Sequence, residues 1–480
     1  MSAPDLGTGN PDYRDSGLVF PDDFLIGAAT ASFQIEGAAR VDGRGPSIWD
    51  TFSHTPGKVL NGDTGDVAAD HYHLLEQDLD LIKSLGLEAY RFSFAWPRIQ
   101  PGGKGAVNPK GIDFYNRLID GLLERGIKPI GTLYHWDLPQ ELEDAGGWPN
   151  RDTAYRFADY AELAGQAYGD RLAVWTTFNE PWCSSYLGYS SGAHAPGRTN
   201  RADAFAALHH LNLAHGLGLE RLREVVTKPD AQFSITLNFH VPRDGGHEGE
   251  DAVRRIDALA NRAFTGPLLK GEYPADLLED TKEITDWSFV NDGDLEIINQ
   301  PIDFLGVNYY STVTVRMWDG KTERITNDGH RPAPGTAWPG AEDVEFMPQG
   351  GPYTDMNWNI APDALEWLLL DLQRQFPDLP LIITENGAAF PGDEVVDGRV
   401  HDPERLDFIR RHLVAVHRAK QQGVDVRGYM VWSLMDNFEW AYGYSKRFGI
   451  THINYETLER TVKDSGLWYS EFAKTHTLPA

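Results

Sequence analysis

The chain has 480 residues, of which 41% are hydrophobic and 24% are charged, and its formal net charge is −28. This is the composition of a globular protein that can bury a large core. The negative charge would repel nucleic acid, anionic membrane surfaces and polyanionic substrates. We therefore expect a neutral small molecule as the ligand, and neither nucleic acid nor membrane as a partner.

β-rich runs alternate along the chain with amphipathic segments of helical period, the pattern of parallel β/α architecture. The expected strands are 24–29, 89–94, 128–134, 173–178, 232–238, 304–309, 381–384 and 428–433. The clearest helices between them are 71–85, 111–125, 151–168, 202–226, 361–375 and 402–422. Eight such units predict one closed (β/α)8 barrel, a TIM barrel with elaborated βα loops.

The domain organisation follows from the same pattern. We expect a flexible N-terminal arm over residues 1–17 and a single catalytic barrel domain over residues 18–480. Segment 313–356 is rich in Gly, Pro and charge, and is expected to be an excursion on the sixth loop. The first 19 residues lack the apolar core of a secretion signal, and the single Cys183 fits a reducing compartment, so we expect a cytoplasmic protein.

Polar and aromatic residues follow the expected strands, at the end where barrels bind their ligands. They are Gln34 and Glu36 after the first strand, Arg91 within the second, His135 and Trp136 after the third, Asn179 and Glu180 after the fourth, Asn308 and Tyr310 at the sixth, Glu385 at the seventh, and Trp432, Glu439 and Trp440 at the eighth. Amide, imidazole and carboxylate groups can hydrogen-bond several hydroxyls, and indole rings offer a flat apolar surface. This combination suits a sugar.

Two glutamates stand out, because each ends a hydrophobic run and is flanked by amides. Glu180 lies in TFNEP (177–181) and Glu385 in ITENG (383–387). Glycoside hydrolysis needs one carboxylic acid to protonate the leaving oxygen, and one carboxylate to attack the anomeric carbon or activate water. Carboxyl groups about 5 to 5.5 Å apart give retention and roughly 6.5 to 9.5 Å inversion, and the sequence leaves both open.

Five segments resemble the signatures of family 1 glycoside hydrolases, the β-glucosidase family. They are FLIGAATASFQIEG (24–37), YHWDLP (134–139), NEP (179–181), ITENG (383–387) and WSLMDNFEW (432–440). The resemblance runs in the family's order from about residue 20 to 469. It implies a (β/α)8 barrel that removes terminal β-D-glucosyl, and also β-galactosyl or β-fucosyl, residues with retention, through a covalent glycosyl-enzyme. The paired histidines lack the spacing of metal ligands and no Gly-rich phosphate loop appears in the sequence, so we expect no cofactor and no metal.

The resemblance also implies roles for individual residues. Glu385 matches the nucleophile and Glu180 the acid/base, and we expect the charge of Glu385 to raise the pKa of Glu180. The residues expected to support the nucleophile are Arg91, Tyr310 and Asn308. Those expected to bind the substrate are Gln34, His135, Trp136, Asn179, Trp432, Glu439, Trp440 and Phe448.

Other functions stay open at this stage. A 6-phospho-β-glycosidase is one alternative: Glu439 would repel a 6-phosphate, whereas Lys446 could bind it. A catalytically silent sugar-binding barrel is another, although both Glu180 and Glu385 are present. A thioglucosidase is disfavoured, since that branch replaces the acid/base by an amide. The expected partners are β-glycosides such as cellobiose and aryl or alkyl β-glucosides, and homo-oligomerisation is left open.

Overall fold

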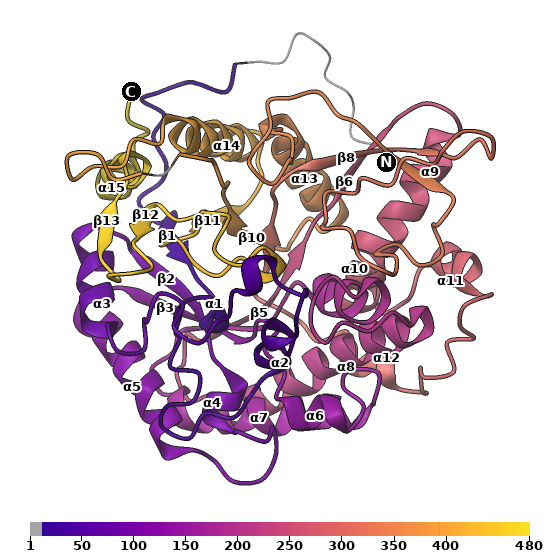
Figure 1. Ribbon diagram of the computed structural model, residues 1–480, viewed down its shortest axis with the longest axis horizontal. Coiled ribbons are helices and arrows are strands. Elements are labelled where there is room, and N and C mark those ends of the chain that lie inside the picture. The colour runs from indigo at the N-terminus through magenta and orange to yellow at the C-terminus, as the bar shows by residue number, and fades with distance from the viewer. Residues whose placement is uncertain (1–11, 393) are drawn as a thin grey trace.

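The computed structural model describes residues 12–392 and 394–480. Eight parallel strands form a closed barrel in the spatial order β1-β11-β10-β7-β5-β4-β3-β2, with helices around it (Figure 1). The strands are β1 (Leu25–Ala29), β2 (Ala89–Ser93), β3 (Lys128–Tyr134), β4 (Val174–Asn179), β5 (Gln232–Asn238), β7 (Phe304–Asn308), β10 (Leu381–Asn386) and β11 (Val426–Trp432). The predicted fold class and all eight strands are confirmed, with ends that differ by at most two residues.

The six predicted helices are also present. They are α3 (Leu75–Ser84), α5 (Pro109–Glu124), α7 (Asp152–Tyr168), α8 (Arg201–Val225), α13 (Pro362–Gln375) and α14 (Pro403–Gln421). The predicted start of the first, at residue 71, is wrong. Asp70 has a left-handed φ of 52°, and the backbone N–H of His71 donates to Ile35 instead of joining a helix.

α5 shows how the sequence sets a helix. Pro109 occupies its first turn, where a missing N–H costs nothing. Phe114, Leu118 and Leu122 recur every four residues and are all buried. Gly126, just past the end, has a φ of 72°, the left-handed conformation that closes many helices. The helix therefore has a defined start, a buried face and a defined stop.

Shorter helices and one further long helix lie in the connections between these elements and after the last barrel strand. The helices are α1 (Ser32–Ile35), α2 (Ile48–His54), η2 (Leu60–Gly62), α4 (Trp96–Ile99), α6 (Gln140–Asp144), η3 (Cys183–Ser191), α9 (Gly249–Asp257), η4 (Ala258–Arg262), α10 (Ala263–Thr265), η5 (Gly266–Lys270), α11 (Ala275–Thr281), α12 (Asp294–Ile298), η6 (Trp440–Tyr442) and α15 (Asp464–Thr475). None of the helices in the described ranges is long and apolar enough to cross a membrane.

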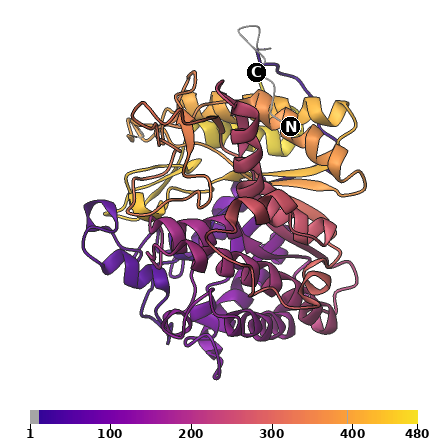
Figure 2. The same cartoon turned by 90° about the vertical axis from the view of Figure 1, so that its right-hand side faces the viewer.

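A three-stranded sheet outside the barrel was not predicted. It consists of β6 (Val241–Asp244), β8 (Thr312–Met317) and β9 (Val344–Met347), in the order β6-β8-β9. The predicted excursion over residues 313–356 thus follows β7, the sixth barrel strand, and carries most of β8 and all of β9. α9 packs against this sheet on the side seen in Figure 2.

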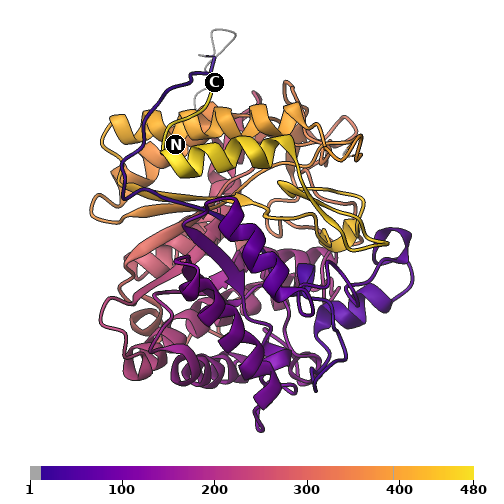
Figure 3. The ribbon, with the colours of Figure 1, turned by 90° about the vertical axis from the view of Figure 1, so that its left-hand side faces the viewer.

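The chain ends beside α14. After the hairpin of β12 (Thr451–Ile453) and β13 (Arg460–Val462), α15 packs along α14, as Figure 3 shows. Of the expected flexible arm, residues 1–11 lie outside the described residues. Within residues 12–17, Tyr13 is buried and its hydroxyl donates to Glu366 of α13 at 2.7 Å. The flexibility of the arm and its boundary at residue 17 stay predictions.

Candidate active site

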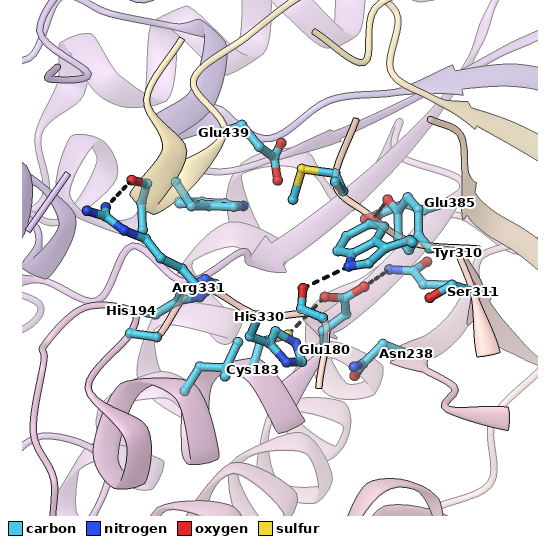
Figure 4. A pocket seen from close by; sticks show the side chains of 18 of the residues that line it. Glu180, Cys183, His194, Asn238, Tyr310, Ser311, His330, Arg331, Glu385 and Glu439 are labelled. Carbon is cyan, nitrogen blue, oxygen red and sulfur yellow. Dashed lines mark hydrogen bonds between the residues drawn. The ribbon is translucent and has the colours of Figure 1, made fainter. Parts of the chain in front are cut away.

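A cavity of about 140 Å³ opens at the carboxyl ends of the barrel strands, and three glutamates face it (Figure 4). The predicted site residues that line it are His135, Trp136, Glu180, Asn308, Tyr310, Glu385, Trp432, Glu439, Trp440 and Phe448. Three more do not line it. Arg91 and Asn179 lie behind it, bonded to lining residues, and Gln34 is bonded to the segment that precedes Glu439.

Glu385, in β10, is 3% exposed and has two strong donors. Arg91, from β2, forms a buried ion pair with it, with Nη1 2.7 Å from Oε1. The hydroxyl of Tyr310 donates to Oε2 at 2.7 Å. Burial raises the pKa of Glu385, and Arg91 and then Tyr310 oppose that rise because both favour the charged form.

Glu180, directly after β4, is 6% exposed and has neutral partners. Asn308 Nδ2 donates to Oε1 at 2.7 Å, and Cys183 Sγ lies 3.2 Å from Oε2. Burial and, second, the nearby charge of Glu385 raise the pKa of Glu180 to about 8. The expected effect of Glu385 on this pKa therefore has the predicted direction, although burial is the larger cause.

A chain of hydrogen bonds through one guanidinium and two side-chain amides connects the two carboxyl groups. Arg91 donates through Nη1 to Glu385 and through Nη2 to Asn179 Oδ1, at 2.7 Å in both cases. Asn308 Nδ2 lies 3.0 Å from Asn179 Oδ1 and also donates to Glu180. Because each link is buried, the positions of the two carboxylates are held relative to one another.

Of the residues predicted to bind the substrate, three carry a buried polar atom without a hydrogen-bond partner in the described ranges: Gln34 Oε1, His135 Nδ1 and Glu439 Oε2. His135 Nε2 faces the amide of Asn179 at 3.1 Å and must accept, so Nδ1 carries the proton. Two acceptors and one donor are thus unsatisfied, and buried polar groups need partners. A hydroxyl group can both donate and accept a hydrogen bond, so the hydroxyl groups of a ligand can supply partners for all three atoms.

Burial, followed by the charges of Glu385 and Glu180, raises the pKa of Glu439 to about 8. Rings surround this part of the cavity. The ring centroids of Trp136 and Trp440 are 4.4 Å apart, and those of His135 and Trp432 are 5.8 Å apart. This end of the cavity therefore combines apolar faces with hydrogen-bonding groups, as a pyranose ring requires.

Three site residues hold unusual backbone conformations. Trp136, Glu180 and Trp440 have φ values of 79°, 47° and 47°, in the left-handed region that disfavours residues with a side chain. Buried bonds hold two of them: Trp136 Nε1 donates to Asn179 O at 2.9 Å, and Glu180 N donates to Thr236 O at 3.0 Å. Such strain concentrates at functional sites.

Known proteins resemble this chain over nearly its whole length. The profile of "Glycosyl hydrolase family 1" matches residues 17–478. The chain belongs to glycosyl hydrolase family 1. It is 53% identical over 470 residues to a bifunctional beta-D-glucosidase/beta-D-fucosidase of Bifidobacterium breve, covering 96% of this chain and 99% of that one.

Solved structures agree with this membership. The psychrophilic beta-glucosidase of Micrococcus antarcticus superposes with a TM-score of 0.90 at 48% identity, covering 96% of this chain and 98% of that one. The family 1 beta-glucosidase of Thermotoga maritima in complex with glucoimidazole gives 0.88 at 44% identity, covering 95% and 99%. This family 1 hydrolase is therefore an enzyme with the (β/α)8 fold of its relatives.

The structure of this family 1 hydrolase also corrects and extends the predicted site. Glu36, expected at the mouth of the barrel, pairs instead with Arg98 of α4 at 2.8 Å and accepts from Tyr115, so it lies outside the cavity. Cys183, which the sequence analysis used only as an indication of a reducing compartment, lies against Glu180. Its spacing of three residues from Glu180, at the start of a helix, was the available signal.

Other lining residues carried no signal in the sequence. Asp328, His330 and Arg331 come from the excursion, and Arg331 Nη1 donates to the carbonyl of Ala441 at 2.7 Å. Only the tertiary fold brings them to the rim. Within residues 12–392 and 394–480, no group of three His, Cys, Asp or Glu residues is arranged to hold a metal ion.

Proposed function

We propose that this family 1 hydrolase acts as a retaining β-glucosidase in which Glu385 is the nucleophile and Glu180 the acid/base. One observation carries the assignment: two buried glutamates share a cavity but have opposite partners. Arg91 and Tyr310 favour a charged Glu385, while Glu180 has neutral partners and a pKa of about 8. Two titratable groups whose surroundings push their pKa values apart are suited to opposite roles.

In the first step, a carboxylate oxygen of Glu385 attacks the anomeric carbon as Glu180 protonates the glycosidic oxygen, and the aglycone leaves as an alcohol. The glycosyl ester removes the charge of Glu385, so the pKa of Glu180 falls. In the second step, Glu180 accepts a proton from water, whose oxygen attacks the same carbon. The ester bond breaks, and glucose leaves with its original β configuration.

The other contacts support roles around these two steps. Arg91, Tyr310 and Asn308 would orient the carboxylates, and Asn179 would meet the 2-hydroxyl. Gln34, His135 and Glu439 would bind the remaining sugar hydroxyls through their unpartnered atoms. The aromatic surfaces around the sugar would come from Trp136, Trp432, Trp440 and Phe448.

The substrates proposed are small β-glycosides, namely cellobiose and aryl or alkyl β-glucosides. Several relatives are named beta-glucosidases, and one carries a beta-fucosidase activity in its name, which supports β-fucosides and, by their shared C4 configuration, β-galactosides as secondary substrates. The single cysteine supports the cytoplasm as the location.

An unphosphorylated sugar is favoured over a 6-phosphosugar. Glu439 has a buried, unpartnered Oε2 at the cavity, where a phosphate would meet an acidic group. Lys446, the residue that could bind a phosphate, is engaged by Asp355, with Nζ 3.0 Å from Oδ2 and 2.7 Å from its carbonyl oxygen. We expect Glu439→Ser to weaken glucoside binding and relax discrimination against 6-phosphoglucosides. Unchanged discrimination would remove this argument.

The function is tested by time-resolved NMR of hydrolysis across a panel of β-glucosides, β-galactosides, β-fucosides and 6-phospho-β-glucosides. We expect turnover of the neutral glycosides, with β-glucose appearing before mutarotation produces the α anomer. Release of α-glucose first would contradict retention. Turnover of the phosphorylated substrate alone would favour the phosphoglycosidase, and no turnover at all would favour a silent sugar-binding barrel.

A further inference from the structure

The carboxyl group of Glu180 has one protein partner on each oxygen, and the two partners differ in chemistry. Asn308 Nδ2 donates to Oε1 at 2.7 Å. Cys183 Sγ lies 3.2 Å from Oε2, a contact that Figure 4 shows. An amide N–H can only donate. A thiol is a weak donor and also a weak acceptor, so it can face either a carboxylate or a protonated carboxyl group.

The thiol is held firmly in this position. Cys183 begins η3 and is 6% exposed, and its backbone N–H donates to the carbonyl of Glu180 at 3.0 Å. Two residues further on, Ser185 Oγ donates to the carbonyl of Pro181 at 2.8 Å, which stiffens the same turn. The contact between Sγ and Oε2 is therefore fixed by the local backbone as well as by the side chains.

The surroundings also keep the thiol protonated. Burial and the adjacent charge of Glu180 raise the pKa of Cys183 well above its usual range. A thiol in this state is a poor nucleophile, because the thiolate is the reactive form. What Cys183 keeps at neutral pH is its S–H group, directed at the one catalytic side chain that must gain and lose a proton in every turnover.

We propose that Cys183 is a positioning residue for Glu180. Its thiol accepts a hydrogen bond from Oε2 while Glu180 is the acid, and donates to Oε2 once Glu180 is the carboxylate. The side chain of Glu180 thereby keeps one orientation through both steps. The weakness of the bond suits this cycle, because neither protonation state is strongly favoured. The proposal rests on the acid/base role of Glu180 given above.

The test compares Cys183→Ala and Cys183→Ser with wild type in the pH dependence of kcat/KM, using an alkyl β-glucoside with a poor leaving group. The thiol lowers the pKa of Glu180, so its loss in the alanine variant should raise that pKa. The alkaline limb is the fall in kcat/KM at high pH that follows deprotonation of Glu180. In Cys183→Ala we expect its midpoint to rise by roughly half a pH unit. In Cys183→Ser, where the hydroxyl is a stronger donor than the thiol, we expect the midpoint to fall by a similar amount. Both variants should lose roughly three- to ten-fold in kcat on this substrate, and less on an activated aryl glucoside.

Ser184→Ala provides the matched control. Ser184 is the next residue and is similarly buried, and its hydroxyl does not bond to Glu180. Its backbone N–H donates to the carbonyl of Glu180 at 3.5 Å, a bond that the substitution leaves in place. This variant should keep the wild-type limb even if its melting temperature falls. An alkaline limb that is the same in wild type, Cys183→Ala and Cys183→Ser would overturn the proposal, because a merely structural residue would lower stability without moving the limb.

Glu180→Ala, measured at high enzyme concentration on the same alkyl β-glucoside, separates this inference from the proposed function. If this variant loses the alkaline limb, Glu180 sets the limb, and an unmoved limb in both cysteine variants then overturns the role of Cys183 alone. If the limb survives in Glu180→Ala, the acid/base assignment fails, and the role of Cys183 fails with it. The two failures therefore give different results.

Discussion

The two sides of the cavity floor differ in kind although each presents a buried glutamate. On the Glu385 side the partners are a guanidinium and a phenol, and both stabilise a negative charge. On the Glu180 side the partners are an amide and a thiol, and burial raises the pKa to about 8. The comparison teaches that two residues of one type can be given different charge states by their neighbours, and the proposed division of roles depends on that difference.

The largest expected effect comes from removing the carboxylate of Glu385. Glu385→Ala should lower turnover by at least about 10⁴-fold, because no other group can form the ester. Added azide fits the space left by the carboxylate and should restore formation of an α-glucosyl azide, seen by NMR. Glu345, buried and ion-paired with Arg316 outside the cavity, offers the control. Glu345→Ala should lower stability, and its folded fraction should keep turnover without azide. Near-normal activity of Glu385→Ala would show that Glu385 is not the nucleophile.

The second prediction concerns Glu180 and its role as the acid. Glu180→Gln keeps the shape of the side chain but has no proton to deliver, so we expect a loss of roughly 10² to 10⁴ in kcat/KM for poor leaving groups. The loss should be much smaller for activated aryl glucosides, which leave without protonation. Steady-state kinetics across leaving groups of different pKa checks this. Equal losses for all of them would count against the acid role.

The wild-type pH profile sharpens the same comparison. The first step needs Glu180 protonated, and its folded-state pKa of about 8 lies above the ordinary value of about 4.5. The reactive fraction is therefore full well below pH 8 and falls as the pH rises through 8. We expect an alkaline limb of kcat/KM near pH 8 on a substrate that needs an acid. A limb near pH 5 would contradict the neutral environment described here.

A smaller effect should follow from weakening the charged side. Tyr310→Phe removes one bond to Glu385 that favours its charged form, so the pKa of Glu385 should rise. Since Glu385 must be ionised, the acidic limb should move to higher pH, with roughly a ten-fold loss in kcat.

Tyr309→Phe is the neighbouring control, because that hydroxyl donates to Ala361 and does not line the cavity. It should cost about 1 kcal/mol of stability and leave the limb in place. Equal limbs in both variants would show that Tyr310 does not tune Glu385.

The barrel and the inner part of the cavity could be predicted because they follow from local patterns. Each barrel strand is a short apolar run, and the residues at its exit must meet at one mouth once the strands close. Glu180 and Glu385 belong to this class. Arg91 was assigned to Glu385 through the family resemblance alone, because the contact between them depends on the shear of the barrel, which local patterns in the sequence do not determine.

The outer part of the cavity could not be predicted for a different reason. β8 pairs with β6, which is distant in the sequence, and this pairing helps to carry the excursion to the rim. Arg331 reaches the cavity only because a carbonyl near the end of the chain accepts its hydrogen bond. Glu36 was predicted to lie at the cavity because it follows a strand, but it forms an ion pair with Arg98 of a nearby helix and lies outside the cavity.

The most direct test of the central claim is to trap the glycosyl-enzyme with an activated 2-deoxy-2-fluoro-β-glucoside and to locate the label by peptide mass spectrometry. Attack by the charge-stabilised carboxylate predicts one glycosyl group per chain, on the peptide that contains Glu385, with slow release by water. A label on Glu180, or inactivation without any glycosyl adduct, would contradict the division of roles between the two sides of the cavity.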